Sequence, residues 1–235
     1  LASPNSLHPA QAIRAAQAGK HILCEKPMAI DPEDCKRMID ACDHHQVRLG
    51  IGFHLRYHPG HGKLRDAVLS GALGQLALAQ AQWGTGARGL VSPNPRPPLQ
   101  AWWEDPTMVG AGAFMGTGVH CVDLLRFVIN DEVVEVTAMT DVSGPTQPLE
   151  HLATVLLRFR NGTLGMITSS RRLPDSQNDI SIYGSKGWGI CEGSLHVNQG
   201  GRLRVDSETT QTQSVYEPSD PLSMYIKQVE SFNEC

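Results

Sequence analysis

The sequence has no run of basic residues and no long uninterrupted apolar stretch. Its 20 Lys and Arg against 24 Asp and Glu give a formal net charge of −4, and positive charge is not gathered anywhere as phosphate-backbone binding requires. Glycine, charged or amide residues interrupt every hydrophobic stretch well short of the roughly 20 residues that cross a bilayer. We therefore expect neither a nucleic-acid nor a membrane partner, and a soluble, cytoplasmic location.

Paired cysteine motifs are missing as well. The six cysteines are scattered along the chain, and no CxxC pair offers the ligand spacing of a zinc site. We predict that they are ordinary reduced thiols and that the protein holds no metal.

The opening third of the chain alternates between helical and strand-like segments. Residues 9–18 are Ala-rich and are followed by Gly19, which is typical of the residue after a helix C-cap. Asp31 supplies an N-cap, and Pro32 suits the first helical position that follows it. We predict helices over residues 9–18 and 32–42 and strands over residues 21–24 and 47–53. This order favours a parallel sheet covered by helices.

A glycine-rich turn between a first strand and a first helix is absent from this pattern. Leu1-Ala2-Ser3 reads as the tail of a strand, and Gly84, Gly86 and Gly89 lie in the wrong context for a G-x-G-x-x-G turn. Without backbone N–H groups at such a turn, residues 1–235 alone are expected to bind a dinucleotide weakly. We expect roughly two βα units of about 30 residues each to precede Leu1.

The rest of the chain is rich in strands separated by turns. A helix is predicted over residues 63–70 and another over residues 224–234, and Asn161-Gly162 is a hairpin signal. The predicted strands cover residues 75–83, 133–141, 152–159, 163–169, 179–183 and 187–191. The predicted fold class is α/β, with a partial Rossmann-type parallel sheet followed by an α+β domain that has a large, mostly antiparallel open sheet.

Three stretches resemble the Gfo/Idh/MocA family of sugar and polyol oxidoreductases. The first joins S-P-N-S-L-H at residues 3–8 to A-G-K-H-I-L-C-E-K-P at residues 18–27. The resemblance implies that Lys26 lies between a nicotinamide and the reacting hydroxyl, beside a Lys-Pro bond that is often cis. A lysine near a charged nicotinamide has its ammonium form disfavoured and can relay a proton. The resemblance implies cofactor contacts from Pro4, Asn5, His8, Glu25, Lys26 and Pro27.

The second stretch, G-I-G-F-H-L-R-Y-H-P at residues 50–59, is similar to the family's strand that leads into its crossover helix. Arg56 and Tyr57 would contact substrate, Arg56 through its forked donors to a carboxylate or polyol oxygens. An interdomain ion pair made by Arg56 is an equal alternative. We interpret His54 and His58 as structural or exposed side chains.

The third stretch, G-A-G-A-F-M-G-T-G-V-H-C-V-D-L-L at residues 110–125, resembles the family's glycine-rich turn into the helix of its catalytic histidine. His120 matches that residue and could take the hydroxyl proton. Asp123, three residues on, shares its helix face and could orient it. Where the family commonly has an Asp, this chain has Gly116, so either Thr117 or Asp123 supplies the missing polar contact or the activity is altered.

The resemblance implies a hydride transfer between NAD or NADP and a hydroxyl carbon of a sugar, polyol or related compound. The catalytic residues would be Lys26, His120 and Asp123. Substrate contacts would come from Arg56, Tyr57, Trp102, Trp103 and Thr117, with the residue 93–98 loop delivering the two tryptophans. Trp102 and Trp103 are equally interpretable as aromatics that cover the sheet.

The resemblance also implies two domains and an oligomer. Residues 1–55 would be the C-terminal half of a Rossmann NAD(P)-binding domain, and residues 56–235 an α+β domain that binds substrate and pairs subunits through its open sheet. Two other functions remain open: an NAD-dependent glycosidase of the same superfamily, and a non-catalytic dinucleotide sensor favoured by Gly116. The sequence does not indicate NAD over NADP or name the substrate, because the residue that selects at the ribose lies outside it.

Overall fold

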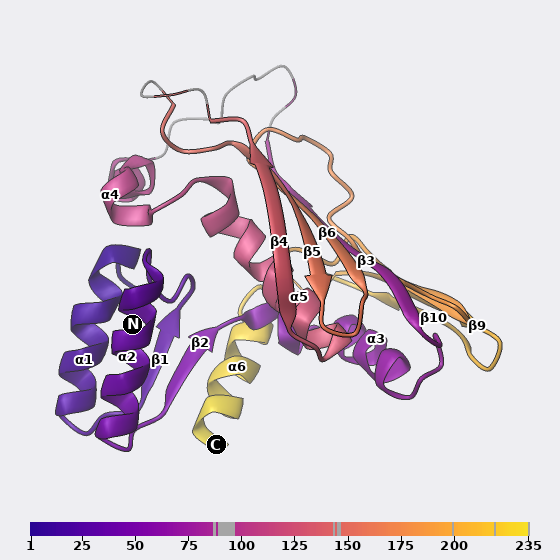
Figure 1. Ribbon diagram of the computed structural model, residues 1–235, viewed down its shortest axis with the longest axis horizontal. Helices are drawn as coiled ribbons and strands as arrows, with labels where there is room; N and C mark the ends of the chain where they lie inside the picture. The colour runs from indigo at the N-terminus through magenta and orange to yellow at the C-terminus, as the bar shows by residue number, and fades with distance from the viewer. Residues whose placement is uncertain are drawn as a thin grey trace.

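The computed structural model describes residues 1–86, 88, 97–142, 144, 147–198, 200–218 and 220–234. A small unit formed by the start of the chain lies beside a larger unit built on an eight-stranded sheet, and the last helix returns to the small unit (Figure 1). The helices are α1 His8–Gln17, α2 Pro32–His44, α3 Pro59–Leu69, α4 Pro106–Val109, α5 Val119–Ile129 and α6 Ser223–Glu234, with turns η1 Asn5–Leu7, η2 His54–Tyr57, η3 Pro98–Glu104 and the π-helical η4 Phe114–Gly118. The strands are β1 Ile22–Glu25, β2 Leu49–Gly52, β3 Leu76–Gly84, β4 Val133–Thr140, β5 Leu152–Phe159, β6 Leu164–Ser170, β7 Ile180–Gly184, β8 Gly187–Glu192, β9 Gly201–Ser207 and β10 Gln211–Tyr216.

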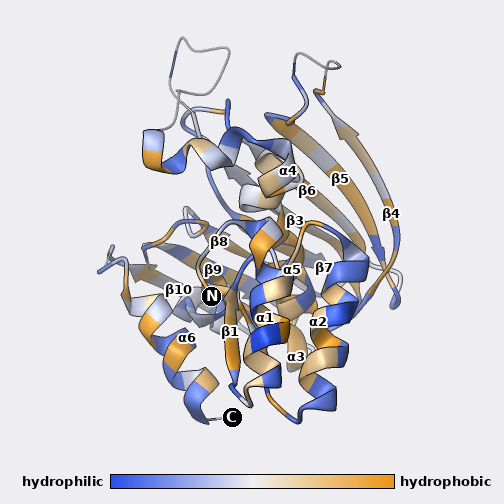
Figure 2. Cartoon of the chain, turned by 90° about the vertical axis from the view of Figure 1, so that its left-hand side faces the viewer, coloured by the Kyte–Doolittle hydropathy of each residue, from blue (hydrophilic) through white to orange (hydrophobic). Residues whose placement is uncertain are grey.

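The small unit has the predicted alternation of helix and strand. β1 and β2 pair in parallel, and the backbone of Leu1 pairs with the other side of β1 through Leu23 and Glu25. The Asp31 carboxylate accepts a hydrogen bond of 2.7 Å from the N–H of Glu33 and so caps α2. The predictions for these four elements are therefore confirmed to within a few residues. In Figure 2, polar and apolar residues alternate along α1, α2 and α6, as expected of helices buried on one side.

The large sheet is mostly antiparallel, as predicted. Its strand order is β10-β9-β8-β7-β3-β6-β5-β4, and β3 with β6 is the one parallel pair in this described sheet. The predicted hairpin at Asn161-Gly162 joins β5 to β6, and Gly162 supplies the positive φ of 90° that this turn needs. The sequence prediction missed β9 and the edge strand β10, both of which are rich in polar residues.

Helices cover one face of this sheet and leave the other open. α3 packs on β8 and β9, and α5 packs on β3 and β6, where Leu124, Leu125 and Val128 enter the main core (Figure 1). Because side chains alternate along a strand, the strand register places a second set of residues on the opposite face. That face carries the exposed apolar side chains Met139, Leu156, Leu164, Tyr183 and Val215.

One apolar segment, Pro106–Ile129, is long enough to cross a membrane by length and composition. The sequence prediction had placed no stretch near that length. In the structure the segment is not one regular helix, since Gly110 adopts a positive φ of 84° between α4 and the turn that begins α5. The α5 part lies in the core, packed on the sheet beside α3.

Candidate active site

Lys26 follows the carboxyl end of β1 and reaches from the small unit to the large one. Its peptide bond to Pro27 is cis. Its ammonium donates a hydrogen bond of 2.8 Å to the carbonyl oxygen of Gly116 and lies 5.9 Å from the ring centroid of Trp103. Burial lowers the pKa of Lys26, and Glu25 offsets part of that effect. The junction of the two units therefore holds an amine that gives up its proton more readily than a solvated lysine.

His120 lies in the first turn of α5 and is only 2% exposed. Its ring is packed against three aromatic rings, with centroids at 4.9 Å for His54, 5.3 Å for Trp83 and 5.8 Å for Phe53. Its Nδ1 atom is enclosed and has no hydrogen-bond partner among the described residues. Burial lowers the pKa of His120 well below its usual value, and Lys26 and His54 lower it further. The imidazole is thus neutral near pH 7 and can accept a proton.

The glycine-rich turn that leads into α5 is held by Glu150. The buried carboxylate of Glu150 accepts hydrogen bonds from the N–H groups of Gly112, at 2.7 Å, and Phe114, at 2.8 Å. The Glu150 carbonyl accepts a third from Ala113 at 2.9 Å. A Cβ on Gly112 would lie 2.0 Å from that carbonyl oxygen, so only glycine fits. The sequence prediction missed Glu150, whose partners are far away in the chain.

The predicted contact between Asp123 and His120 is not formed, because Asp123 binds another side chain. Both of its carboxylate oxygens accept hydrogen bonds from the Arg56 guanidinium, one of them at 2.8 Å. The fork of Arg56 matches the two carboxylate oxygens, and this pairing uses the acceptors that would have oriented the imidazole. The prediction that Asp123 orients His120 is therefore corrected. Arg56 does make an ion pair, but its partner lies within residues 56–235, so the predicted interdomain pair is not the one that the structure shows.

The remaining predicted substrate residues are in different settings. Thr117 Oγ1 lies 2.7 Å from Ser169 Oγ on β6, so its hydroxyl ties the turn to the sheet. Tyr57 packs against the main core. Trp102 and Trp103 on η3 stack on each other with centroids 4.6 Å apart, and both are half-buried, with Trp103 beside Lys26. The loop predicted to deliver them covers residues 93–98. Residues 93–96 of that loop, together with Gly89 and Cys235, lie outside the described part of the chain.

The predicted cofactor residues lie near the same junction of the two units. His8 is fully buried, with Nδ1 3.1 Å from the carbonyl oxygen of Pro27 and Nε2 2.9 Å from that of Ser3. Asn5 donates through Nδ2 to the carbonyl oxygen of Val109, while Pro4 caps η1. His8 therefore helps to hold the segment that carries Lys26 and Pro27, whereas Asn5 ties the start of the chain to α4. Contacts with a dinucleotide remain predictions for all six.

Comparison with known proteins identifies the family. The chain matches the family profile described as the GFO/IDH/MocA C-terminal domain over residues 61–189, and the profile described as an oxidoreductase family NAD-binding Rossmann fold over residues 1–53. The chain belongs to the Gfo/Idh/MocA oxidoreductase family.

Relatives and solved structures agree with this membership. The chain is 28% identical to 1,5-anhydro-D-fructose reductase of Ensifer adhaerens, covering 100% of this chain and 68% of that protein. It is 31% identical to myo-inositol 2-dehydrogenase of Thermotoga maritima, covering 80% of this chain and 54% of that protein. The aldose-aldose oxidoreductase of Caulobacter crescentus, solved with glycerol, aligns with a TM-score of 0.82 at 28% identity over 99% of this chain and 67% of that one. The chain thus spans between about half and two thirds of these relatives.

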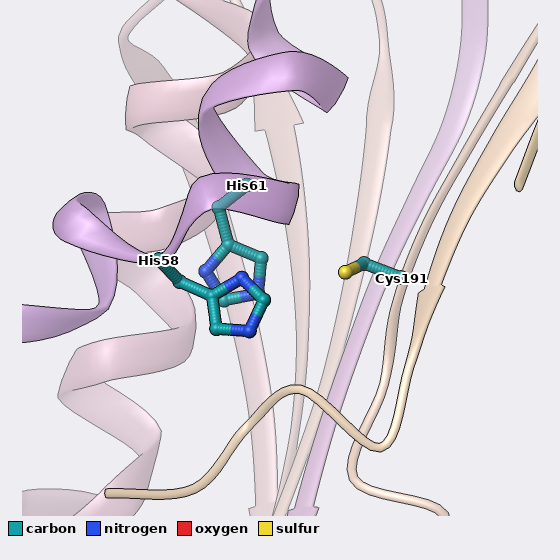
Figure 3. Close-up of side chains that lie close together, drawn as sticks. All are labelled: His58, His61 and Cys191. Carbon is teal, nitrogen blue, oxygen red and sulfur yellow. The ribbon is translucent and has the colours of Figure 1, made fainter. Parts of the chain in front are cut away.

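A cluster of two histidines and a cysteine lies apart from Lys26 and His120. Figure 3 shows His58 and His61, from the start of α3, close to the sulfur of Cys191 on β8, and their donor atoms all lie within 4.8 Å of one another. His58 Nδ1 accepts from the N–H of Gly60, and its Nε2 lies 3.3 Å from the Gly200 carbonyl oxygen. The His61 nitrogens face Leu55 and Ser194, both at 2.8 Å. Burial raises the pKa of the Cys191 thiol to about 11.

This cluster is best explained as packing. Each ring nitrogen of His58 and His61 already has a partner, whereas a metal ligand needs a free lone pair. The three side chains fasten the start of α3 to β8 in the large core. The prediction that the protein holds no metal stays a prediction. The five described cysteines are free thiols.

Proposed function

We propose that the protein carrying this chain transfers a hydride between NAD(P) and a hydroxyl-bearing carbon of a sugar or polyol. The observation that carries the proposal is the hydrogen bond from Lys26 to Gly116, one helical turn before His120. It brings an amine with a lowered pKa to the turn that positions a neutral, buried imidazole. Such a pair suits a proton transfer coupled to alcohol oxidation.

The residues present fit a nicotinamide at this junction. Ligands of open α/β sheets bind outside the carboxyl ends of the strands, and Lys26 and Phe53 each follow such an end, of β1 and β2. The described hydrogen bond of Lys26 goes to a carbonyl oxygen. Among the described residues, no carboxylate is therefore hydrogen-bonded to its ammonium group. NAD(P), when bound, supplies the hydride acceptor or donor. Pro27 and Lys26 would hold the nicotinamide end.

The chain's own residues supply the proton chemistry. His120 accepts the proton of the substrate hydroxyl as the C–H bond breaks, and returns it in the reverse direction. Lys26 donates a hydrogen bond to that hydroxyl oxygen and stabilises the negative charge that develops on it. Trp102 and Trp103 offer flat apolar faces that suit the C–H faces of a sugar ring. The roles of Arg56 and Tyr57 in specificity would be indirect, through the Asp123 pair and the core.

The test is a spectrophotometric screen of the full-length protein for NAD(P)H production with a panel of sugars and polyols. Wild-type protein should turn over, and His120→Ala should lower kcat/KM roughly hundredfold or more, as expected for loss of a general base. His45→Gln, at an exposed position beyond α2, is the matched control and should leave the rate unchanged.

Other outcomes separate the alternatives. Release of an aglycone from glycosides without net NAD(P)H would support a glycosidase. Tight NAD(P) binding with no turnover on either panel would support a dinucleotide sensor. Turnover that is unaffected by His120→Ala would overturn the assignment of His120.

We also propose that two copies of the chain pair through the open face of the large sheet. An exposed sheet face with several large apolar side chains is typical of an interaction surface. Two such sheet faces can pack against each other with their side chains interdigitated.

A further inference from the structure

The paired tryptophans of η3 are attached to the large sheet through Glu104, the residue that follows them. A carboxylate oxygen of Glu104 accepts a hydrogen bond of 2.6 Å from the guanidinium of Arg171. Arg171 comes directly after β6, and its backbone N–H donates to the carbonyl oxygen of His151 at 2.8 Å. The ion pair therefore joins the segment that carries Trp102 and Trp103 to the end of an interior strand of the sheet.

The strand end that carries Arg171 is also fixed to the turn that leads into α5. The Ser169 hydroxyl donates a hydrogen bond of 2.9 Å to the carbonyl oxygen of Ala113, and it lies 2.7 Å from the hydroxyl of Thr117. One short segment at the end of β6 thus contacts both the turn that precedes His120 and the segment that carries the tryptophans. This arrangement fixes the spacing between the two.

The burial of Arg171 distinguishes this ion pair from an ordinary surface contact. The Arg171 side chain is 13% exposed, and that of Glu104 is 45% exposed. Ion pairs between fully exposed side chains contribute little because water and salt screen them, and partial burial reduces that screening. The next residue, Arg172, pairs with Asp141 at 3.3 Å. The two consecutive arginines therefore bind different carboxylates.

The tryptophans that this ion pair anchors lie beside the proposed reaction centre. The ring centroid of Trp103 lies 5.9 Å from the ammonium of Lys26, and Trp102 stacks on Trp103 at 4.6 Å. We propose that Arg171 is a positioning residue that, through Glu104, holds the tryptophan pair beside Lys26 and so sets the affinity for the sugar or polyol. Its effect on affinity rests on the proposed function, whereas the anchoring of the tryptophan pair does not.

The kinetic signature follows from what aromatic stacking does. Flat indole faces contact a sugar ring to a similar extent before and during the reaction, whereas Lys26 and His120 handle the proton. Displacing the indoles should therefore raise KM and leave kcat nearly unchanged. In the full-length protein, Arg171→Met, which keeps an unbranched apolar stem without donors, should raise KM for the best substrate of the panel about tenfold, near the upper limit for one aromatic contact.

The anchoring itself is measured by circular dichroism of the full-length protein, without substrate or cofactor. Two stacked indoles couple their electronic transitions and give a paired positive and negative band in the far ultraviolet, which Trp102→Phe should abolish and so assign. Arg171→Met should remove most of this band, and Arg171→Lys, which can still donate to Glu104, should retain it. Arg126→Met is the matched control, because it breaks a different ion pair, with Glu132, and should change neither the band nor KM. An unchanged band in Arg171→Met would overturn the proposal.

A double-variant cycle separates positioning from a direct contact between Arg171 and the substrate. Glu104→Leu removes the acceptor at a half-exposed position, so it tests the proposal even if Arg171→Met does not fold, and it should remove the band and raise KM in the same way. The double variant should raise KM no further, because the two residues act as one unit. Additive increases, or a Glu104→Leu protein with the wild-type KM, would assign Arg171 to the substrate and overturn the proposal.

The two measurements also separate this proposal from the proposed function. The dichroism band needs no turnover, so its loss in Arg171→Met and Glu104→Leu would uphold the anchoring even in a protein that oxidises no sugar. Absence of turnover would then count against the proposed function alone. An intact band would overturn the anchoring whatever the activity.

Discussion

The ammonium of Lys26 donates its hydrogen bond to the backbone of Gly116, so the two units of the chain meet at a lysine and a carbonyl oxygen. At the position of Gly116, the Gfo/Idh/MocA pattern commonly has an acidic side chain. A Cβ built on Gly116 meets no atom within 4 Å, so the space for such a side chain exists. Burial lowers the pKa of Lys26, and its hydrogen-bond partner at this position is a neutral carbonyl oxygen.

Gly116→Asp should therefore fold normally and raise the pKa of Lys26. A carboxylate next to the ammonium favours the charged form, which opposes the lowering by burial. A titration of isotope-labelled lysine by NMR should show the Lys26 signal moving to higher pH, and any limb of the pH–rate profile that depends on Lys26 should move the same way.

Gly116→Asn is the matched control for this variant, since it has the same shape without the charge. It should leave the titration of Lys26 in place. A Gly116→Asp protein with an unchanged Lys26 titration would show that the side chain at this position does not face the amine.

The Arg56–Asp123 pair gives a second prediction, on stability. Arg56→Ala leaves a buried carboxylate without its donors and should lower the free energy of unfolding by about 1–3 kcal/mol. Burial already raises the pKa of Asp123, and Arg56 counteracts that effect. A carboxyl group whose folded pKa lies above its unfolded value stabilises the native state only at low pH. The Arg56→Ala protein should therefore regain relative stability as the pH falls.

Urea unfolding at several pH values measures this effect. The double variant Arg56→Ala with Asp123→Ala should be less destabilised than the sum of the two single variants, because no charge is then left buried. Additive losses would show that the two side chains act independently.

Local sequence signals predicted the elements that depend on neighbouring residues. Asp31 and Pro32 marked the start of α2, and Asn161-Gly162 marked a hairpin, because caps and turns are determined within a few residues. The partners of Glu150 and of Asp123 could not be predicted in this way, since they lie 38 and 67 positions away in the chain. The three-residue spacing places Asp123 and His120 on the same face of α5. The Asp123 carboxylate nevertheless binds the guanidinium of Arg56, which lies on η2.

Glu150 provides the third prediction. Glu150→Gln replaces one acceptor oxygen by an N–H donor that would face the N–H of Gly112 or Phe114. The buried donor left unpaired should cost about 1–3 kcal/mol of unfolding free energy. Because this turn leads into α5, kcat should fall along with stability, as measured by denaturant unfolding and steady-state kinetics. Glu208→Gln, on the surface, should change neither. Equal stability of the two variants would contradict a clamping role.

The open face of the large sheet leads to the last prediction. Leu156 lies on this face beside Met139 and is 53% exposed in the single chain. A stable pairing of two sheets buries about 1,200–2,000 Å² in total, and a lysine at its centre would have to lose its hydration. Leu156→Lys should therefore convert the dimer or larger assembly to monomers in light scattering of the full-length protein. Ile39→Lys, an equally exposed apolar position on α2, should leave the mass unchanged. A wild-type monomer, or an assembly that survives Leu156→Lys, would show that subunits do not meet on this face.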